Sequence, residues 1–296
     1  MAFNWRTFKT RALTAIVFVA VMLTGLLWNH WSFFILFSII HFGCWWEYLK
    51  ITEKIYQTSV HTYTKLGFML MGYGLMLWFC GPDYQAGNYL LRDNFSFPVS
   101  AAGFILTAIG IFRQGSIHLN AFGTTLLGIF YISMSWGLMM DLYSTSIDIY
   151  LHDTMFVFET GMIPVIIILS IWINDTMAYI VGSLIGRTPL SVVSPKKTWE
   201  GTIGGVVLAV IVISLLFPLI YGRSFNFLLS VIISLVTLIT AVTGTLGDLL
   251  ESKLKRLADV KDSGQIMPGH GGFLDRFDSL LLATPFVWLY VQLFMK

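Results

Sequence analysis

Charged side chains are scarce in this sequence. Asp, Glu, Lys and Arg make up 11% of the 296 residues, whereas hydrophobic residues make up 56% and the mean hydropathy is +0.76. Because an ordinary soluble domain carries about 25% charged residues, this composition excludes a soluble protein. The formal net charge of +2 is also too small to indicate nucleic-acid binding, and we expect no nucleic-acid partner.

Cysteine is nearly absent. The two cysteines, Cys44 and Cys80, lie in apolar stretches, and neither has a cysteine or histidine neighbour at metal-ligand spacing. We expect reduced packing residues, not a disulfide or a zinc site. A cleavable signal peptide is not indicated either, because Trp28-Asn29-His30 after the first apolar run is no small-residue cleavage site.

Long apolar runs dominate the chain. A spanning helix needs ~20 mostly apolar residues, and the runs bounded by charge or by Gly, Pro and Asn predict about nine spans. The runs 31–46 and 66–80 are short, which leaves a merged or re-entrant arrangement open. The predicted spans are 12–28, 31–46, 66–80, 97–112, 121–140, 163–182, 203–221, 227–246 and 279–294.

The predicted fold is an all-α, polytopic transmembrane helix bundle in one membrane domain, 1–296. Residues 1–162 hold spans for packing, dimer contacts and the lipid side. Polar motifs concentrate in 163–296, which we expect to be the catalytic half, with a polar, cytoplasm-facing cavity built by the C-terminal helices.

The basic residues test this topology independently of hydropathy. With a cytoplasmic N-terminus, fifteen of the eighteen Lys and Arg residues fall in inside segments, and only Arg92, Arg223 and Lys296 fall outside. This agrees with the positive-inside rule. It predicts that the segments 187–201 and 247–278 both face the cytoplasm.

The segment 247–278 concentrates charge late in the chain. If the eighth span continues past the membrane as a helix, Asp248, Ser252 and Lys255 share one face, four and three positions apart. A solvated helix end with ion pairs would give the same pattern. The glycine-rich segment that follows favours a functional interpretation.

That segment runs from Pro268 to Asp278. Its glycines provide a backbone that can take positive φ and approach a phosphate, with N–H groups for the phosphate oxygens. Phe273 is expected to open the last helix, with Asp275 and Asp278 on one face. Oxygen-only acidic ligands indicate Mg²⁺ or a similar hard cation rather than zinc. Enzymes that transfer phosphoryl or nucleotidyl groups use carboxylates, a metal ion and nearby basic residues.

Two further motifs precede this segment. Asp175 follows Asn174 inside the sixth span, where a charge costs at least ~2.5 kcal/mol, so it is a functional candidate. A structural pair between helices is the alternative. Lys196 and Lys197, in the segment from Ser194 to Gly201, suit a lipid phosphate or a triphosphate, although they also suit plain positive-inside anchors.

The spacing of Ser252-Lys253-Leu254-Lys255-Arg256, Lys261-Asp262-Ser263-Gly264 and Pro268 to Asp278 closely resembles the signature of the phosphatidate cytidylyltransferases, or CDP-diacylglycerol synthases. The segments 194–201 and 174–182 resemble two other sequence segments of the same family. The resemblance implies an enzyme that converts CTP and phosphatidate to CDP-diacylglycerol and pyrophosphate. It also implies a homodimer and a metal pair, Mg²⁺ with a second cation such as K⁺, in a bacterial inner membrane.

The resemblance and the motifs described above together imply roles for individual residues. The metal ligands would be Asp248, Asp275 and Asp278, and Lys255 and Asp175 would join them in catalysis. The residues expected to bind substrate are Ser252, Arg256, Lys261, Asp262, His270, Gly271, Gly272, Arg276, Ser194, Lys196 and Lys197.

Two other functions stay open at this point. A cytidylyltransferase or a CTP-dependent kinase acting on another membrane lipid would need the same kind of residues. A transporter could use Asn174 and Asp175 as its binding site, but transporters usually contain two related halves. The two halves of this chain are not alike.

Overall fold

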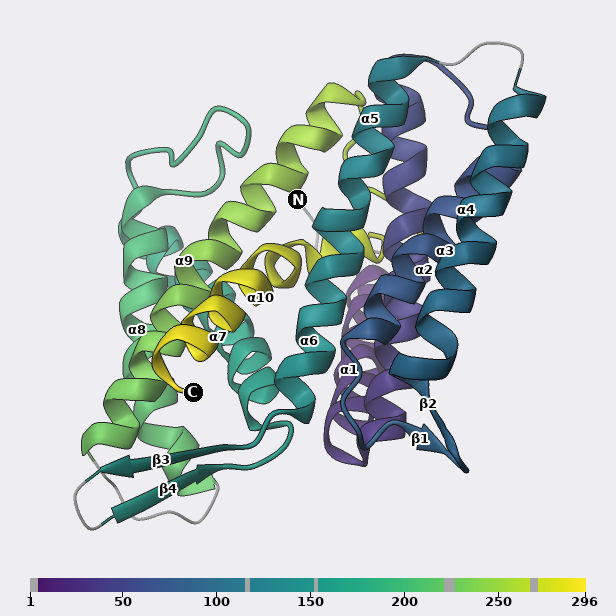
Figure 1. Ribbon diagram of the computed structural model, residues 1–296. Coiled ribbons are helices and arrows are strands. Elements are labelled where there is room, and N and C mark those ends of the chain that lie inside the picture. The colour runs from purple at the N-terminus through teal and green to yellow at the C-terminus, as the bar shows by residue number, and fades with distance from the viewer. Residues whose placement is uncertain (1–4, 115–117, 152–153, 221–226, 267–270) are drawn as a thin grey trace. The chain divides into compact units, whose positions relative to one another are not determined.

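The computed structural model describes residues 5–114, 118–151, 154–220, 227–266 and 271–296 (Figure 1). This part of the chain is almost entirely helical. The helices are α1 (Trp5–Leu27), α2 (His30–Tyr56), α3 (Thr62–Trp78), α4 (Ser96–Arg113), α5 (Leu119–Gly128), α6 (Ser135–Ser144), α7 (Met162–Ile185), α8 (Trp199–Ile220), α9 (Phe227–Leu257) and α10 (Leu274–Phe294).

Short elements interrupt or join these helices. The π-helical segments η1 (Leu91–Phe95) and η2 (Ile129–Met134) lead into α4 and join α5 to α6. Two antiparallel hairpins, which the sequence did not predict, pair β1 (Gln85–Ala86) with β2 (Tyr89–Leu90) and β3 (Ile147–Leu151) with β4 (Thr154–Phe158). The predicted all-α polytopic bundle is confirmed in its essentials.

Seven helical stretches of the described chain are long and apolar enough to cross a membrane. Each of the nine predicted runs overlaps a helix. The two predicted runs outside the seven correspond to α1, of which the described side chains form the apolar stretch Leu13–Leu27, and to α3, which has 17 residues. The seven are His30–Tyr56, Leu91–Arg113, Leu119–Ser144, Met162–Ile185, Trp199–Leu219, Leu229–Leu257 and Leu274–Phe294.

The outer surfaces of these helices are apolar. Val17, Leu184 and Leu219, for example, are more than half exposed. Large exposed apolar side chains on long helices are stable when lipid covers them. The chain is therefore an integral membrane protein.

The chain forms two compact units. The first combines 1–141 with 254–277, and the second combines 142–253 with 278–296. The predicted division at residue 162 followed the sequence motifs, whereas these units divide the long helices α9 and α10 between them.

In the first unit, α2 is fixed at its start and in its middle. Asn29 and Ser32 form a capping box at its N-terminus. Further along, His41 Nε2 and Trp45 Nε1 both lie within 2.9 Å of the Ser133 hydroxyl on η2, and all three side chains are buried. This hydrogen bonding holds α2 against the π-helical segment.

In the second unit, glycines bring helix backbones together. A Cβ atom at Gly205 of α8 would lie 2.9 Å from the carbonyl oxygen of Asn174 on α7, and one at Gly201 would lie 2.7 Å from that of Ala178. Small residues allow such close approach between membrane helices. The contact fixes Asn174 and its neighbours beside the first turns of α8.

Candidate active site

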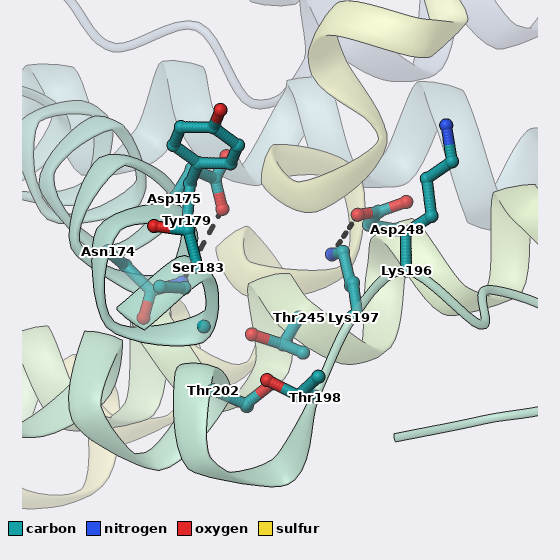
Figure 2. Close-up of a pocket in the computed structure, with 12 residues that line it drawn as sticks. Asn174, Asp175, Tyr179, Ser183, Lys196, Lys197, Thr198, Thr202, Thr245 and Asp248 are labelled. Atoms are coloured by element: carbon teal, nitrogen blue, oxygen red, sulfur yellow. Dashed lines mark hydrogen bonds and ion pairs between the residues drawn. The ribbon is translucent and has the colours of Figure 1, made fainter. Parts of the chain in front are cut away.

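A polar cavity of about 340 Å³ lies in the second unit, between α7, the loop before α8, and α9 (Figure 2). Asn174, Asp175 and Tyr179 line it from α7, and Asp248 lines it from α9. The predicted polar cavity is thus present in the C-terminal half. Its lining residues are Asn174, Asp175, Ala178, Tyr179, Gly182, Ser183, Lys196, Lys197, Thr198, Thr202, Thr245 and Asp248.

Three motifs far apart in the sequence meet at this cavity. Lys197 forms an ion pair with Asp248, and both side chains are about one-third exposed or less. The Ser252 hydroxyl donates to the other Asp248 oxygen at 3.2 Å, so these two of the three residues predicted to share a helical face do so. Asp175 is at an exposed position of α7, and the Asn174 amide contacts it at 3.5 Å.

Three carboxylates gather on α9 and α10 within the second unit. Oxygen atoms of Asp248, Glu251 and Asp278 all lie within 4.8 Å of one another. Glu251 is fully buried and Asp278 is 7% exposed. The helices can approach here because Gly247 has no side chain: a Cβ atom there would lie 2.5 Å from the Asp278 carbonyl oxygen. An oxygen-only group of this kind suits a hard divalent cation.

The loop that carries Lys197 is held by the first turn of α8. The Glu200 carboxylate accepts hydrogen bonds from the backbone N–H groups of Arg187 and Thr188 and from the Thr188 hydroxyl. Thr198 caps α8 by accepting from the Gly201 N–H at 3.1 Å. These contacts fix the loop at both ends and so limit the positions available to Lys197.

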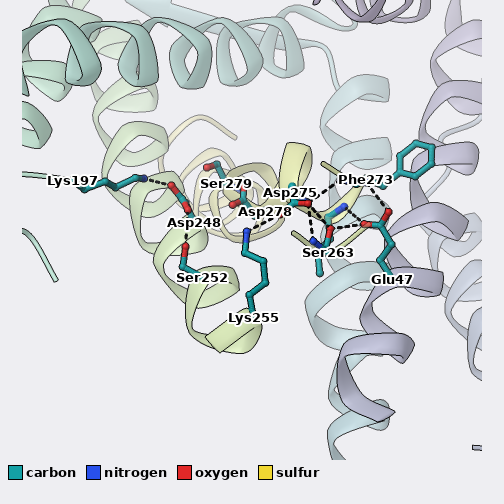
Figure 3. Close-up of polar contacts among 12 residues, drawn as sticks. Glu47, Lys197, Asp248, Ser252, Lys255, Ser263, Phe273, Asp275, Asp278 and Ser279 are labelled. Atoms are coloured by element: carbon teal, nitrogen blue, oxygen red, sulfur yellow. Dashed lines mark hydrogen bonds and ion pairs between the residues drawn. The ribbon is translucent and has the colours of Figure 1, made fainter. Parts of the chain in front are cut away.

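A second polar group lies in the first unit, around Asp275 (Figure 3). The Lys255 ammonium lies 2.6 Å from Asp275 Oδ1. Asp275 Oδ2 accepts from the N–H groups of Ser263 and Gly272, both at 2.8 Å.

The glycine-rich segment adopts part of the backbone conformation expected of it. Gly271 has φ of 83°, which L side chains rarely adopt. The helix starts at Leu274, one residue later than predicted. The N–H groups of Gly272, Phe273 and Leu274, which we expected to face a phosphate, donate instead to Asp275 and to Glu47.

Comparison with known proteins identifies the protein family of this chain. A model of the Cytidylyltransferase family matches residues 9–294. The chain belongs to this family. The expected family and the nucleotidyltransferase class are therefore confirmed.

Three similar proteins carry the same name. A phosphatidate cytidylyltransferase of Staphylococcus saprophyticus is 32% identical over 94% of this chain and 96% of its own length. One of Synechocystis is 35% identical over 69% of this chain and 73% of its own length. One of Bacillus subtilis is 47% identical, but the match spans 42% of this chain and 45% of that protein.

The other predicted site residues differ in exposure. Arg256, Lys261, Asp262, Arg276 and Lys196 are exposed. Their roles in binding substrate stay predictions, as do those of Ser194, Ser252, Gly271 and Gly272. His270 lies outside the described residues.

Sequence reasoning missed two buried glutamates. Glu251 follows Asp248 by three positions, so helical periodicity could have placed it beside that residue. Glu47 lies on α2, more than 200 positions before the residues it contacts. No local pattern marks it, apart from its position directly after the predicted span 31–46.

Proposed function

We propose that this protein transfers the cytidylyl group of CTP to phosphatidate, forming CDP-diacylglycerol and pyrophosphate. The observation that carries this proposal is the similarity to a phosphatidate cytidylyltransferase over 94% of the chain and 96% of the relative. A cavity lined by two lysines and two aspartates in a membrane-embedded unit supports it.

The donor set of Asp248, Glu251 and Asp278 fits Mg²⁺, because it offers only carboxylate oxygens and these lie close together. When bound there, Mg²⁺ would supply charge neutralisation for the triphosphate and the departing pyrophosphate. In this proposal Glu251 takes the place that the sequence had suggested for Asp275. A second cation such as K⁺ stays a proposal from the family resemblance.

The reaction requires positioning more than covalent chemistry from the protein. A phosphate oxygen of phosphatidate attacks the α-phosphorus of CTP and forms the new phosphoanhydride bond. The bond from that phosphorus to the bridging oxygen breaks, and its electron pair leaves with pyrophosphate. Lys197 and Lys255 bind phosphate oxygens and stabilise the charge that develops in the transition state. No nucleophilic side chain is required.

Location and assembly are part of the same proposal. The excess of basic residues in segments such as 187–201 and 247–278 supports a cytoplasmic N-terminus and cytoplasmic chemistry. The bacterial relatives support the inner membrane. A homodimer is proposed from the family resemblance.

The test uses purified protein, phosphatidate in detergent micelles and two labelled forms of CTP. With label in the α-phosphate, the chloroform-soluble product should become radioactive. With label in the γ-phosphate, the label should stay in the aqueous phase as pyrophosphate. A panel of other lipid phosphates and the corresponding lipid alcohols replaces phosphatidate in parallel reactions.

The two labels separate the alternatives. A CTP-dependent lipid kinase would move the γ-label, and not the α-label, into the lipid. A cytidylyltransferase for another lipid would prefer a different member of the panel. Either result would overturn the proposed function.

A further inference from the structure

A buried glutamate of α2 contacts the start of α10 within the first unit. Glu47 is 2% exposed. Its Oε1 accepts from the Phe273 N–H at 3.0 Å, and its Oε2 accepts from the Leu274 N–H at 2.8 Å. The Ser263 hydroxyl lies 2.6 Å from the same Oε2 (Figure 3).

These contacts compensate for the burial of a charge. A carboxylate that accepts several hydrogen bonds in a buried site is retained because each bond is charge-assisted. The first N–H groups of a helix have no partner within the helix, and the helix dipole favours an anion there. Glu47 therefore fits the start of α10 as an anionic cap supplied by a different helix.

The contacts continue from Glu47 to Lys255. The Ser263 hydroxyl also lies 2.9 Å from Asp275 Oδ2. A hydroxyl carries one proton, so it donates to one carboxylate at a time, and the shorter distance favours Glu47. Asp275 is oriented by the N–H groups of Ser263 and Gly272, and its Oδ1 binds the Lys255 ammonium.

Two signature glycines make room for Glu47. A Cβ atom at Gly264 or at Gly272 would overlap the Glu47 carboxylate. Gly264 and Gly272 are not among the described glycines that have a positive φ. Their lack of a side chain therefore serves the approach of a carboxylate of the protein, which differs from the phosphate approach expected from the sequence.

We propose that Glu47 is a positioning residue that fixes the Ser263–Gly272 segment and, through Ser263 and Asp275, the Lys255 ammonium. This inference rests on the proposed function, because Lys255 acts there on a substrate phosphate. Glu47 itself touches no reacting atom in this proposal.

The test is a double-mutant cycle on the full-length enzyme in detergent. Glu47→Gln keeps the shape but replaces one acceptor oxygen with an NH₂ group, so it cannot accept from all three donors. It should lower kcat/KM for CTP by about tenfold or more. Once Lys255→Ala has removed the ammonium, Glu47→Gln should add less than about threefold, because coupled residues show non-additive effects.

Glu53→Gln is the matched control on the same helix. Glu53 lines a pocket that Asp262 and Ser263 also line, but its carboxylate pairs with Lys65 at 2.8 Å and accepts from the Val60 N–H, so its polar contacts differ from those that link Glu47 to Lys255. Glu53→Gln should change kcat/KM only slightly. In the double variant, the fold-changes caused by Glu53→Gln and by Lys255→Ala should multiply. Full multiplication of the Glu47→Gln and Lys255→Ala effects would overturn the inference.

Two further measurements cover other outcomes. If Glu47→Gln does not fold, Ser263→Ala replaces it in the cycle, because this variant removes the hydroxyl and keeps the contacts of Glu47 with the backbone. If the effects of Ser263→Ala and Lys255→Ala multiplied fully, the inference would also be overturned. Hydrogen exchange at Phe273 and Leu274 gives a readout that needs no activity. Exchange should accelerate in Glu47→Gln but not in Glu53→Gln. Unchanged exchange in folded Glu47→Gln would refute the role of Glu47 as a cap. This holds even if the wild-type protein proved inactive with phosphatidate.

Discussion

Lys197, in the loop before α8, forms an ion pair with Asp248 on α9, and Asp248 is also one of three clustered carboxylates. One ammonium thus partly neutralises a group that would otherwise hold several negative charges close together. Both residues line the same cavity. Bound Mg²⁺ would replace this neutralisation, which would leave Lys197 available to substrate phosphate.

We predict that Lys197→Ala raises KM for CTP or phosphatidate and lowers kcat/KM roughly 10- to 100-fold, which corresponds to one charged contact of about 1.5–3 kcal/mol. Lys253→Ala is the control, because Lys253 is an exposed lysine of the same helix as Asp248. Steady-state kinetics with each substrate varied in turn measure both effects. Equal activities of the two variants would show that Lys197 is only a membrane anchor.

The carboxylate cluster should determine the Mg²⁺ dependence. An amide keeps the shape of a carboxylate but lacks the charge that a hard cation requires. Asp248→Asn, Glu251→Gln and Asp278→Asn should each nearly abolish turnover and raise the Mg²⁺ concentration for half-maximal activity. The control is Asp148→Asn, on an exposed position of β3. Substantial activity of folded variants at ordinary Mg²⁺ would contradict the metal site.

Asp275 should behave differently from Asp278 although both lie in the first turns of α10. Its oxygens bind Lys255, Ser263 and Gly272. Asp275→Asn should therefore lower turnover without changing the Mg²⁺ concentration for half-maximal activity. Titration of activity with Mg²⁺ distinguishes the two aspartates. A parallel shift in both variants would return Asp275 to the metal ligands that the sequence suggested.

The sequence predicted the helices well because a membrane imposes a strong and simple requirement. Each apolar run must satisfy its backbone hydrogen bonds internally, so length and hydropathy suffice to find it. The continuation of α9 to Leu257 was also predictable, since Asp248, Ser252 and Lys255 follow helical spacing. The hairpin of β3 and β4 was missed because it lies between the predicted spans 121–140 and 163–182, where no strand was predicted.

Contacts between distant segments could not be predicted in the same way. Nothing near Glu47 in the sequence indicates that Phe273 and Leu274 donate to it. The same limit applies to the glycine-rich segment. Its glycines indicated a close approach, but the sequence did not reveal that the approaching group at Gly264 and Gly272 is a carboxylate of the protein.

The topology can be tested with cysteine labelling. The two native cysteines are buried, so they give a low background. Ser146→Cys and Gln265→Cys place thiols at exposed positions. From the distribution of basic residues, an impermeant maleimide should label Ser146→Cys in intact cells and Gln265→Cys only after permeabilisation. Labelling of Gln265→Cys in intact cells would reverse the proposed orientation.

The requirement for glycine at position 264 follows from the position of Glu47. A methyl group at Gly264 would displace the Glu47 carboxylate, which is buried and cannot move without losing its hydrogen bonds. We expect Gly264→Ala to destabilise the protein by about 1–3 kcal/mol, the usual cost of overpacking, and to lower activity. Gly123→Ala on α5 is the control, because a Cβ atom there meets nothing within 4 Å.

Gly264→Ala and Gly123→Ala should have different effects on the thermal midpoint. Alanine favours a helix over glycine by up to about 1 kcal/mol, so Gly123→Ala should keep or raise the thermal midpoint in detergent. Thermal unfolding followed by size-exclusion chromatography measures both variants. If Gly264→Ala matched the wild type in midpoint and in kcat/KM, Glu47 would have room to move, and its hydrogen bonds to Phe273 and Leu274 would not be needed to hold the start of α10.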